Sequence, residues 1–322
     1  VVRYHFFYAK ISSGEHMTYL LIFNPKSGKG KIQKDLPKIQ SFFEEKKMSL
    51  DIHETVSQDD ARNYLLHSKK SYDCVMVAGG DGTISTVLNG LLKLDKKPIL
   101  GVLPYGSAND VSHILGIKKN ILKTLELYTT TQPSYIDAYQ MNDHFFMYTA
   151  AAGLFTRISY DISRQSLNQF GQIAYYIEGI KDLTSEYNFQ MEFQTHQKTF
   201  QKNVTLLLGL SANRVGGIPL LFKTKSKLDD GLFEINLFES KGFLSKLRVL
   251  SFFIRFGRKV RSDIVLKGDY FKINTSKDVR WNADGEHVCN GDIEIKVLPK
   301  ILPVFMSQRA KRKLLVKNEF QK

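Results

Sequence analysis

The sequence has only two cysteines, Cys74 and Cys289, among its 322 residues. Two distant thiols make neither the disulfide framework of a small secreted domain nor a zinc-binding spacing, and they fit a reducing compartment. Cys74 lies in an apolar segment, where we expect a buried thiol. The eight histidines are scattered, without a His-x-x-x-His pair. A cysteine- or histidine-based metal site is therefore not indicated.

Long apolar runs are also missing. No stretch approaches the roughly 20 residues that a membrane-spanning helix needs. Residues 1–16 lack the apolar core and small-residue cleavage pattern of a signal peptide. Met17 directly precedes the first predicted strand, so we expect residues 1–16 to be an extension outside the fold. These absences predict a cytoplasmic protein.

Positive charge is present in excess. The chain has 46 Lys and Arg against 32 Asp and Glu, a formal net charge of +14. This surplus favours a polyanionic partner, such as a nucleotide, a nucleic acid or an acidic membrane surface. No RNA- or DNA-reading motif is present, so we expect no nucleic-acid partner.

Strand-like and helix-like segments alternate in the first part of the chain. The predicted strands are short, apolar on both faces and followed by helical segments, and they cover residues 18–24, 50–56, 73–79 and 98–104. Such alternation predicts an open parallel sheet with helices on both faces. We assign residues 17–137 to this α/β domain.

The pattern changes at about residue 138. Most later segments are short and alternate between apolar and polar residues, and only 171–185 and 241–259 are helical in period. This predicts a second domain over residues 138–300, an antiparallel β-sandwich. We expect residues 301–320 to pack back on the first domain.

Three glycine-containing turns follow strands of the first domain. The most informative is Gly79–Thr83 (GGDGT), after the strand that ends at Ala78. Glycine lets the backbone approach a ligand closely, and the helix that follows offers N–H groups to a phosphate. Asp81 is unsuited to phosphate alone and indicates a divalent cation or a reacting group. Thr83 can cap the helix and donate to a phosphate oxygen. The alternative is an ordinary strand-to-helix turn, with Asp81 as helix cap.

The other two turns are NPKSGKGK at residues 24–31 and PYGSAND at residues 104–110. The first is not a Walker A loop, because its spacing differs. In the second, Asn109 and Asp110 are placed to cap the next helix. Because the carboxyl ends of parallel strands meet at one edge, the three turns together predict one cleft for one phosphate-bearing ligand.

These motifs, in this order, resemble the diacylglycerol kinase catalytic-domain family, specifically its bacterial soluble lipid kinases. GGDGT is shared with NAD kinases and loosely with phosphofructokinases, but further motifs narrow the resemblance, which extends over about residues 18–300. They are NPKSG (24–28), PYGSAND (104–110), GQIAYYIEG (171–179), KLDDGLFEI (227–235) and NADGE (282–286). The resemblance implies an ATP- and Mg²⁺-dependent lipid kinase, with conversion of diacylglycerol to phosphatidic acid as the default reaction.

The resemblance also implies roles for individual residues. Lys26 and Lys29 would offset phosphate charge, and Asp81 would face the nucleotide and its catalytic Mg²⁺. Asp284 or Glu286 would accept the proton of the lipid hydroxyl, although NADGEHV alone predicts only a hairpin. The residues expected to contact ATP are Asn24, Pro25, Lys26, Ser27, Gly28, Thr55, Gly79, Gly80, Asp81, Gly82, Thr83, Ile84, Ser85 and Ser107.

A structural Mg²⁺ is implied at the KLDDGLF segment. Its ligands would be the carbonyl of Lys227, the carboxylate of Asp230 and the carbonyl of Leu232, with Asp229 reaching the ion through water. Few protein ligands suit a hard cation that completes its octahedron with water. The alternative is a charged turn without a metal.

The sequence departs from the family pattern at three places. Ser107 stands where Thr is usual, but it keeps the hydroxyl for phosphate contact. Ser85 and Thr86 stand where Asn-Glu is common. Val111-Ser112-His113 replaces an aromatic-Ala-Arg sequence, which removes a positive charge near the cleft. Two alternatives stay open: a soluble-metabolite kinase of the NAD kinase type, and a non-catalytic lipid- or nucleotide-binding regulator.

Residues 241–261 predict a basic amphipathic helix that contacts the lipid substrate at an anionic membrane surface. Phe252 falls among the basic residues, which suits an exposed aromatic at the interface. The alternative is an ordinary helix that covers the second sheet. One stripe holds Phe243, Leu247, Leu250 and Ile254; the other holds Lys241, Ser245, Arg248, Arg255 and Lys259. We thus expect peripheral membrane association. Homodimers are common in the family, but the sequence does not determine the oligomeric state or the lipid.

Overall fold

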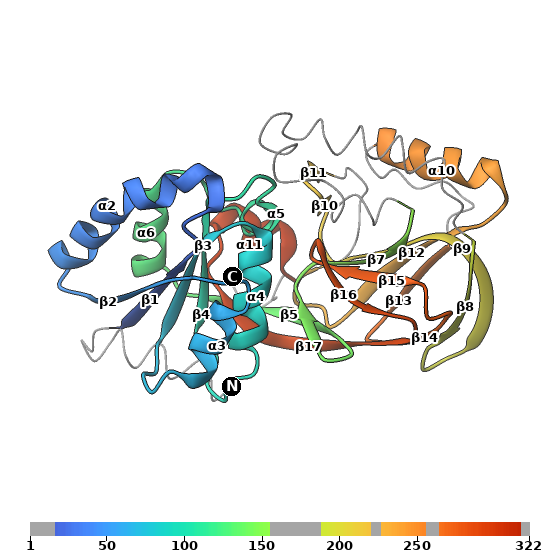
Figure 1. Cartoon of the computed structure of the whole chain (residues 1–322), viewed down its shortest axis with the longest axis horizontal. Coiled ribbons are helices and arrows are strands. Elements are labelled where there is room, and N and C mark those ends of the chain that lie inside the picture. Colours follow the sequence, from blue (N-terminus) through green and yellow to red (C-terminus); the bar gives the residue numbers. More distant parts are fainter. Residues whose placement is uncertain (1–16, 155–187, 220–226, 256–263, 317–322) are drawn as a thin grey trace.

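The structure, a computed structural model, describes residues 17–154, 188–219, 227–255 and 264–316. It has an α/β half and a β-rich half that lie side by side (Figure 1). Several predictions fall outside the described residues: the 1–16 extension, the helix at 171–185, the 171–179 motif, and the ends of the 241–261 and 301–320 segments.

The first half contains a four-stranded parallel sheet in the order β4-β3-β1-β2. The strands are β1 (Thr18–Phe23), β2 (Ser49–Glu54), β3 (Cys74–Gly79) and β4 (Ile99–Pro104). Every residue of β3 is buried, including Cys74, as expected for a central strand with both faces covered.

Helices cover both faces of this sheet (Figure 1). One pair packs together on one face and the other pair on the opposite face. The first pair is α2 (Lys31–Glu45) and α6 (Ile121–Thr130); the second is α3 (Asp60–His67) and α4 (Asp81–Leu91). A short helix, α5 (Asp110–Leu115), follows the turn after β4.

The second half is antiparallel throughout its described pairs. Its strands are β5 (Ser134–Met141), β6 (His144–Phe146), β7 (Thr149–Gly153), β8 (Phe189–Gln194), β9 (Thr199–Leu210), β12 (Phe233–Glu239), β13 (Ile264–Gly268), β14 (Tyr270–Asn274), β15 (Arg280–Ala283) and β16 (Glu286–Asn290), with a small hairpin of β10 (Arg214–Val215) and β11 (Ile218–Pro219). The predicted fold class, parallel α/β followed by antiparallel β, is confirmed.

One long strand, β17 (Ile293–Val304), connects the two halves. Its first part pairs antiparallel with β14, and both its first and last parts pair antiparallel with β5. Val304 at its end also pairs parallel with Leu100 of β4. The two sheets are therefore one continuous sheet. Helix α11 (Gln308–Leu314) follows, and the Ser307 backbone N–H before it donates to the Leu115 carbonyl of the first half at 3.0 Å.

Apolar side chains form a separate core in each half. The first core holds the buried residues of β1, β3 and β4 together with Leu302–Met306 from the end of the chain. The second core contains Trp281, Phe233 and Phe271, all essentially buried. Tyr139 of β5 already belongs to the second core, whereas Ile136 and Ala138 belong to the first.

Helix α10 (Phe243–Ile254) packs on the second half with the side that we expected to face solvent. Phe252, predicted as an exposed aromatic, is 2% exposed and packs edge-on against Phe238 with ring centroids 5.1 Å apart. The stripe with Leu247 and Ile254 faces outward instead. Both stripes carry apolar residues, so the periodicity did not determine which one packs on the sheet.

Helix α4 begins at Asp81, directly after the two glycines Gly79 and Gly80. Gly80 occupies the N-cap position and no side chain caps the helix, so neither Asp81 nor Thr83 acts as a cap. The space beside Gly79 is filled by the Thr83 side chain.

Among the described residues, no helix is long and apolar enough to span a membrane.

Candidate active site

The three glycine-containing turns meet at the carboxyl edge of the parallel sheet. The Tyr105 N–H donates to the Gly79 carbonyl at 3.2 Å, and a side-chain carbon on Gly106 would clash with the backbone of Gly80. A side-chain carbon on Gly28, which has a positive φ of 57°, would clash with the Tyr105 carbonyl. Glycine at these positions therefore lets the turns pack backbone against backbone.

The predicted nucleotide residues differ in how accessible they are. Lys26 and Ser107 are exposed at the rim, and Gly80–Thr83 are half-buried beside them. Ile84 and Ser85 are buried within α4, and Thr55 is buried behind the first turn, where its hydroxyl donates to the Phe23 carbonyl at 3.3 Å. The remaining members, Asn24, Pro25, Ser27, Gly28 and Gly79, line the same edge.

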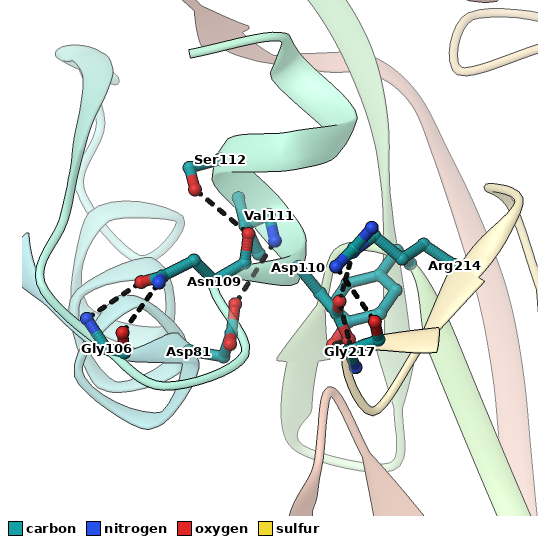
Figure 2. A network of polar contacts seen from close by, with 9 residues as sticks. Asp81, Gly106, Asn109, Asp110, Val111, Ser112, Arg214 and Gly217 are labelled. Carbon is teal, nitrogen blue, oxygen red and sulfur yellow. Dashed lines mark hydrogen bonds and ion pairs between the residues drawn. The ribbon is translucent and has the colours of Figure 1, made fainter. Parts of the chain in front are cut away.

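Asn109 fixes the third turn, although not as the helix cap that the sequence suggested. It has a positive φ of 53° and makes no side-chain capping bond to α5. Its amide instead bonds both backbone groups of Gly106: Oδ1 accepts from the N–H at 2.7 Å and Nδ2 donates to the carbonyl at 2.6 Å (Figure 2). The amide thereby holds the turn in its close approach to Gly80.

Asp81 is the first residue of α4, and its side chain reaches the start of α5. Its Oδ1 accepts the backbone N–H of Val111 at 3.1 Å (Figure 2). Burial, together with the nearby Asp110 carboxylate, raises the pKa of Asp81, while hydrogen bonds from the backbone at the start of α5 oppose the rise. An ionised Asp81 therefore favours added positive charge in its surroundings.

Asp110 links the two halves of the molecule. Its side chain is 1% exposed, and its Oδ1 lies 2.6 Å from Nε of Arg214 in β10. The Gly217 N–H donates to both carboxylate oxygens, at 3.1 and 3.0 Å (Figure 2). The sequence analysis assigned Asp110 only a capping role and did not identify Arg214. The one sequence feature that pointed to a positive charge elsewhere was His113, which stands where the family pattern has arginine.

The acidic hairpin of the second half closes the site from the other side. Ala283 pairs with Glu286, so Asp284 and Gly285 form a two-residue turn with positive φ values of 49° and 89°. Asp-Gly suits such a primed turn, and the predicted hairpin is present. The hairpin carries two carboxylates, Asp284 in the turn and Glu286 at the start of β16, and they point to different places.

Asp284 is held by backbone N–H groups. Its carboxylate accepts from Met147, Tyr148 and Thr149, at 2.6, 3.0 and 3.1 Å. Burial and the nearby Asp81 charge raise its pKa to about 7, although these hydrogen bonds lower it. A carboxylate with three donors is already engaged and serves to fix the hairpin against residues 147–149.

Glu286 reaches the glycine turn itself. It is half-buried, and its Oε1 lies where a side-chain carbon on Gly82 would be. The carboxylate of the second half thus contacts the GGDGT turn of the first. Asp81, Gly82 and Glu286 are brought together at the meeting point of the two halves.

The predicted cation turn, residues 227–232, lies apart from this point, between the second half and α11. Oδ1 of Asp230 accepts the Leu232 N–H at 3.2 Å, and Oδ2 accepts the Lys227 N–H at 3.4 Å. The ammonium of Lys267 lies 3.0 Å from the same Oδ2. Asp229, expected to reach a metal through water, accepts the Val316 N–H at 2.7 Å.

The donor set of this turn, one carboxylate and two carbonyls, has the chemistry that a hard cation prefers. A lysine already neutralises the carboxylate, however, so a magnesium ion here would compete with Lys267 for Oδ2. Across the described ranges, no three His, Cys, Asp or Glu side chains are arranged to hold a metal by themselves.

Residues 18–141 match the family described as the diacylglycerol kinase catalytic domain. The chain is 32% identical over 271 residues to a diacylglycerol kinase of Bacillus subtilis, covering 83% of this chain and 89% of the relative. The chain belongs to the diacylglycerol kinase family. A Staphylococcus carnosus diacylglycerol kinase is 30% identical over 274 residues, covering 83% of this chain and 88% of that protein.

Solved structures of the diacylglycerol kinase family share the fold. A crystal structure of a putative diacylglycerol kinase from Bacillus anthracis superposes with a TM-score of 0.76 at 26% identity, covering 91% of this chain and 96% of that one. A second structure from the same organism gives 0.74 at 25% identity, covering 91% and 98%. Membership makes the chain a phosphotransferase with an alcohol acceptor.

Proposed function

We propose that this protein is an ATP- and Mg²⁺-dependent lipid kinase that converts diacylglycerol to phosphatidic acid. The observation that carries the proposal is the contact between Glu286 and Gly82. A carboxylate from the second half lies against the turn that offers backbone N–H groups to phosphates. A phosphoryl donor and an acceptor hydroxyl would meet at this point.

In this proposal Glu286 is the general base. The acceptor hydroxyl oxygen forms a bond to the γ-phosphorus, the bond from that phosphorus to the β,γ-bridging oxygen breaks, and ADP leaves. The hydroxyl proton passes to Glu286. Asp284 is less suited to this role because three backbone N–H groups already occupy its oxygens, so we assign it the positioning of the hairpin.

Magnesium would arrive with the triphosphate. Phosphate oxygens and water supply most ligands of such an ion, with one or two carboxylates from the protein. Asp81 fits this role because it is half-buried beside the glycine turn and two further carboxylates, Asp110 and Asp284, add negative charge nearby. The ion would neutralise charge on the transferred phosphoryl group.

The test is transfer of the labelled γ-phosphate of ATP to acceptors in mixed micelles. We expect labelled phosphatidic acid from diacylglycerol, loss of the product with EDTA, and no labelled NAD. Labelling of NAD without any lipid product would support a metabolite kinase instead. A full panel of lipid alcohols without any product, despite ATP binding, would support a non-catalytic regulator.

We also propose that α10 contacts the anionic membrane surface that supplies the lipid. Leu244, Leu247 and Ile254 are 70, 46 and 66% exposed on its outer face, while Val249 and Phe252 pack inward. Exposed leucines beside basic residues such as Lys241 suit an interfacial contact, and the net charge of +14 suits an anionic surface. Figure 1 shows α10 on the outside of the second half.

Vesicle flotation tests this contact. The double variant Leu244→Ser/Leu247→Ser should lose binding to phosphatidylglycerol-containing vesicles. Leu122→Ser removes an equally exposed leucine from α6 of the first half and serves as the control. Equal binding of all three proteins would contradict a role for α10.

A further inference from the structure

Tyr148 contacts two buried carboxylates: its hydroxyl donates to Asp110 and its backbone N–H donates to Asp284. The hydroxyl lies 3.4 Å from Asp110, and Asp81 accepts the N–H of Val111, the residue after Asp110. Burial and the charges of Asp110, Asp81 and Asp284 raise the pKa of Tyr148. Such a cluster is electrostatically costly unless a positive charge compensates it. Among the described residues, the ion pair made by these carboxylates is that between Asp110 and Arg214.

Arg214 reaches Asp110 from the other half of the molecule. Its Nε lies 2.6 Å from Oδ1, and its Nη2 donates to the Gly217 carbonyl at 2.9 Å. Gly217 in turn donates its N–H to the same carboxylate. The guanidinium and the backbone of the β10–β11 hairpin together form a cradle around Asp110 (Figure 2).

The Asp110 cradle bears directly on Asp81. Asp110 is the first residue of α5, and the next residue, Val111, donates its N–H to Asp81. A shift of Asp110 would therefore move the group that orients Asp81. The contact also fixes the β10–β11 hairpin of the second half to the first half, beside the point where Glu286 meets Gly82.

The position of Arg214 is notable because this sequence has His113 where the family pattern has arginine. His113 lies on the same helix as Asp110, and Arg214 is close enough that, with partial burial, it lowers the pKa of His113. A neutral imidazole does not replace a guanidinium. In this structure the positive charge beside Asp110 comes from Arg214 in the second half.

We infer that Arg214 is a positioning residue for phosphoryl transfer. In this inference Arg214, from the second half, supplies the positive charge that an arginine at position 113 would supply from the first half. It acts through Asp110 and the start of α5 on Asp81. This inference rests on the proposed function for its kinetic consequence, but its structural consequence, order at the start of α5, is independent of the reaction.

The test compares Arg214→Gln and Arg214→Lys with the double variant Arg214→Gln/His113→Arg. Because a misplacement of about 1 Å can cost 10²-fold, we expect the glutamine variant to lose about 10–100-fold in kcat with little change in KM for ATP. Lysine should be intermediate, since it cannot make both contacts of the guanidinium. The double variant should recover most of kcat. Arg62→Gln, which breaks an exposed pair with Asp59, is the matched control and should keep full activity.

Hydrogen exchange provides a readout besides activity. The Val111 amide should exchange faster in Arg214→Gln than in the wild type and regain protection in the double variant. Full kcat and unchanged protection in Arg214→Gln would overturn the inference, as would a double variant no better than the single one. If the wild type phosphorylates no lipid, the proposed function fails, while the exchange measurement still decides the role of Arg214.

Discussion

The two sides of the site are built in different ways. The side in the first half is a backbone surface, in which Gly28, Gly80 and Gly106 let three turns touch. The side in the second half is a hairpin with two acidic side chains, Asp284 and Glu286. Backbone surfaces depend on the absence of side chains, whereas the hairpin depends on where two carboxylates point. The two sides should therefore fail differently when mutated.

Among variants of the two sides, Glu286→Gln should have the largest effect on activity. A general base typically contributes about 10²–10⁴-fold to the rate, so we expect kcat for lipid phosphorylation to fall within that range. The glycine turns are untouched, so ATP affinity should stay nearly constant. Initial rates with varied ATP and lipid measure both quantities, and wild-type turnover would exclude Glu286 as the base.

Alanine at two of the glycines separates the sides further. In Gly82→Ala the new carbon meets only the end of the flexible Glu286 side chain, so kcat should drop while the melting temperature is nearly kept. In Gly106→Ala the new carbon meets the Gly80 backbone, which cannot easily move aside. We expect that variant to lose stability and ATP binding together. Equal melting temperatures for the two variants would contradict this difference.

The hairpin side should also respond to pH. The folded-state pKa of Asp284 is about 7, above its ordinary value of 3.8, so the folded protein holds this proton more tightly than the unfolded chain. The stability that it contributes is complete below the ordinary value and is lost as the pH rises through about 7. Asp284→Asn should therefore flatten the decline in melting temperature between about pH 4 and 7.

A second carboxylate serves as the control for this titration. Burial raises the pKa of Asp137 to about 6, so its contribution should be lost at a lower pH than that of Asp284. Asp137→Asn should therefore flatten the decline only in the lower part of the range. If the melting temperature of the wild type depended on pH as little as that of Asp284→Asn, the raised pKa of Asp284 would be contradicted.

The smallest effect concerns the cation turn, away from both sides of the site. Asp230→Ala should lower the melting temperature, because the carboxylate holds the turn through Leu232 and Lys267. If magnesium also binds there, added Mg²⁺ should raise the wild-type melting temperature, and more so in Lys267→Met, where the competing ammonium is gone. No response to Mg²⁺ in either protein, measured by calorimetry without nucleotide, would exclude a structural cation at this turn.

The sequence predicted the backbone side of the site better than the side-chain side. Glycines after buried strands are local signals, so the 79–83 and 104–110 turns were recognisable, and the Asp284-Gly285 hairpin likewise. The donors to Asp284 lie at residues 147–149, more than 130 positions away in the chain. Such contacts depend on the tertiary fold and leave no local pattern.

Two errors have the same physical origin. The outward face of α10 was misassigned because both of its stripes contain large apolar residues, and only the neighbouring Phe238 shows which one packs. Arg214 was overlooked because its partner, Asp110, is 104 positions earlier. In both places the decisive neighbour belongs to a distant segment.

Because strand β17 belongs to both sheets, the two halves cannot be separated by cutting the chain once. The first residues of β17 complete the antiparallel sheet and its last residue completes the parallel one, so a cut anywhere before Ile293 would deprive the N-terminal fragment of a strand that its core requires. Truncated halves should be insoluble when expressed alone, and chimaeras between relatives should fold only if β17 matches both partners. The chain would then melt as one cooperative unit, despite its two cores.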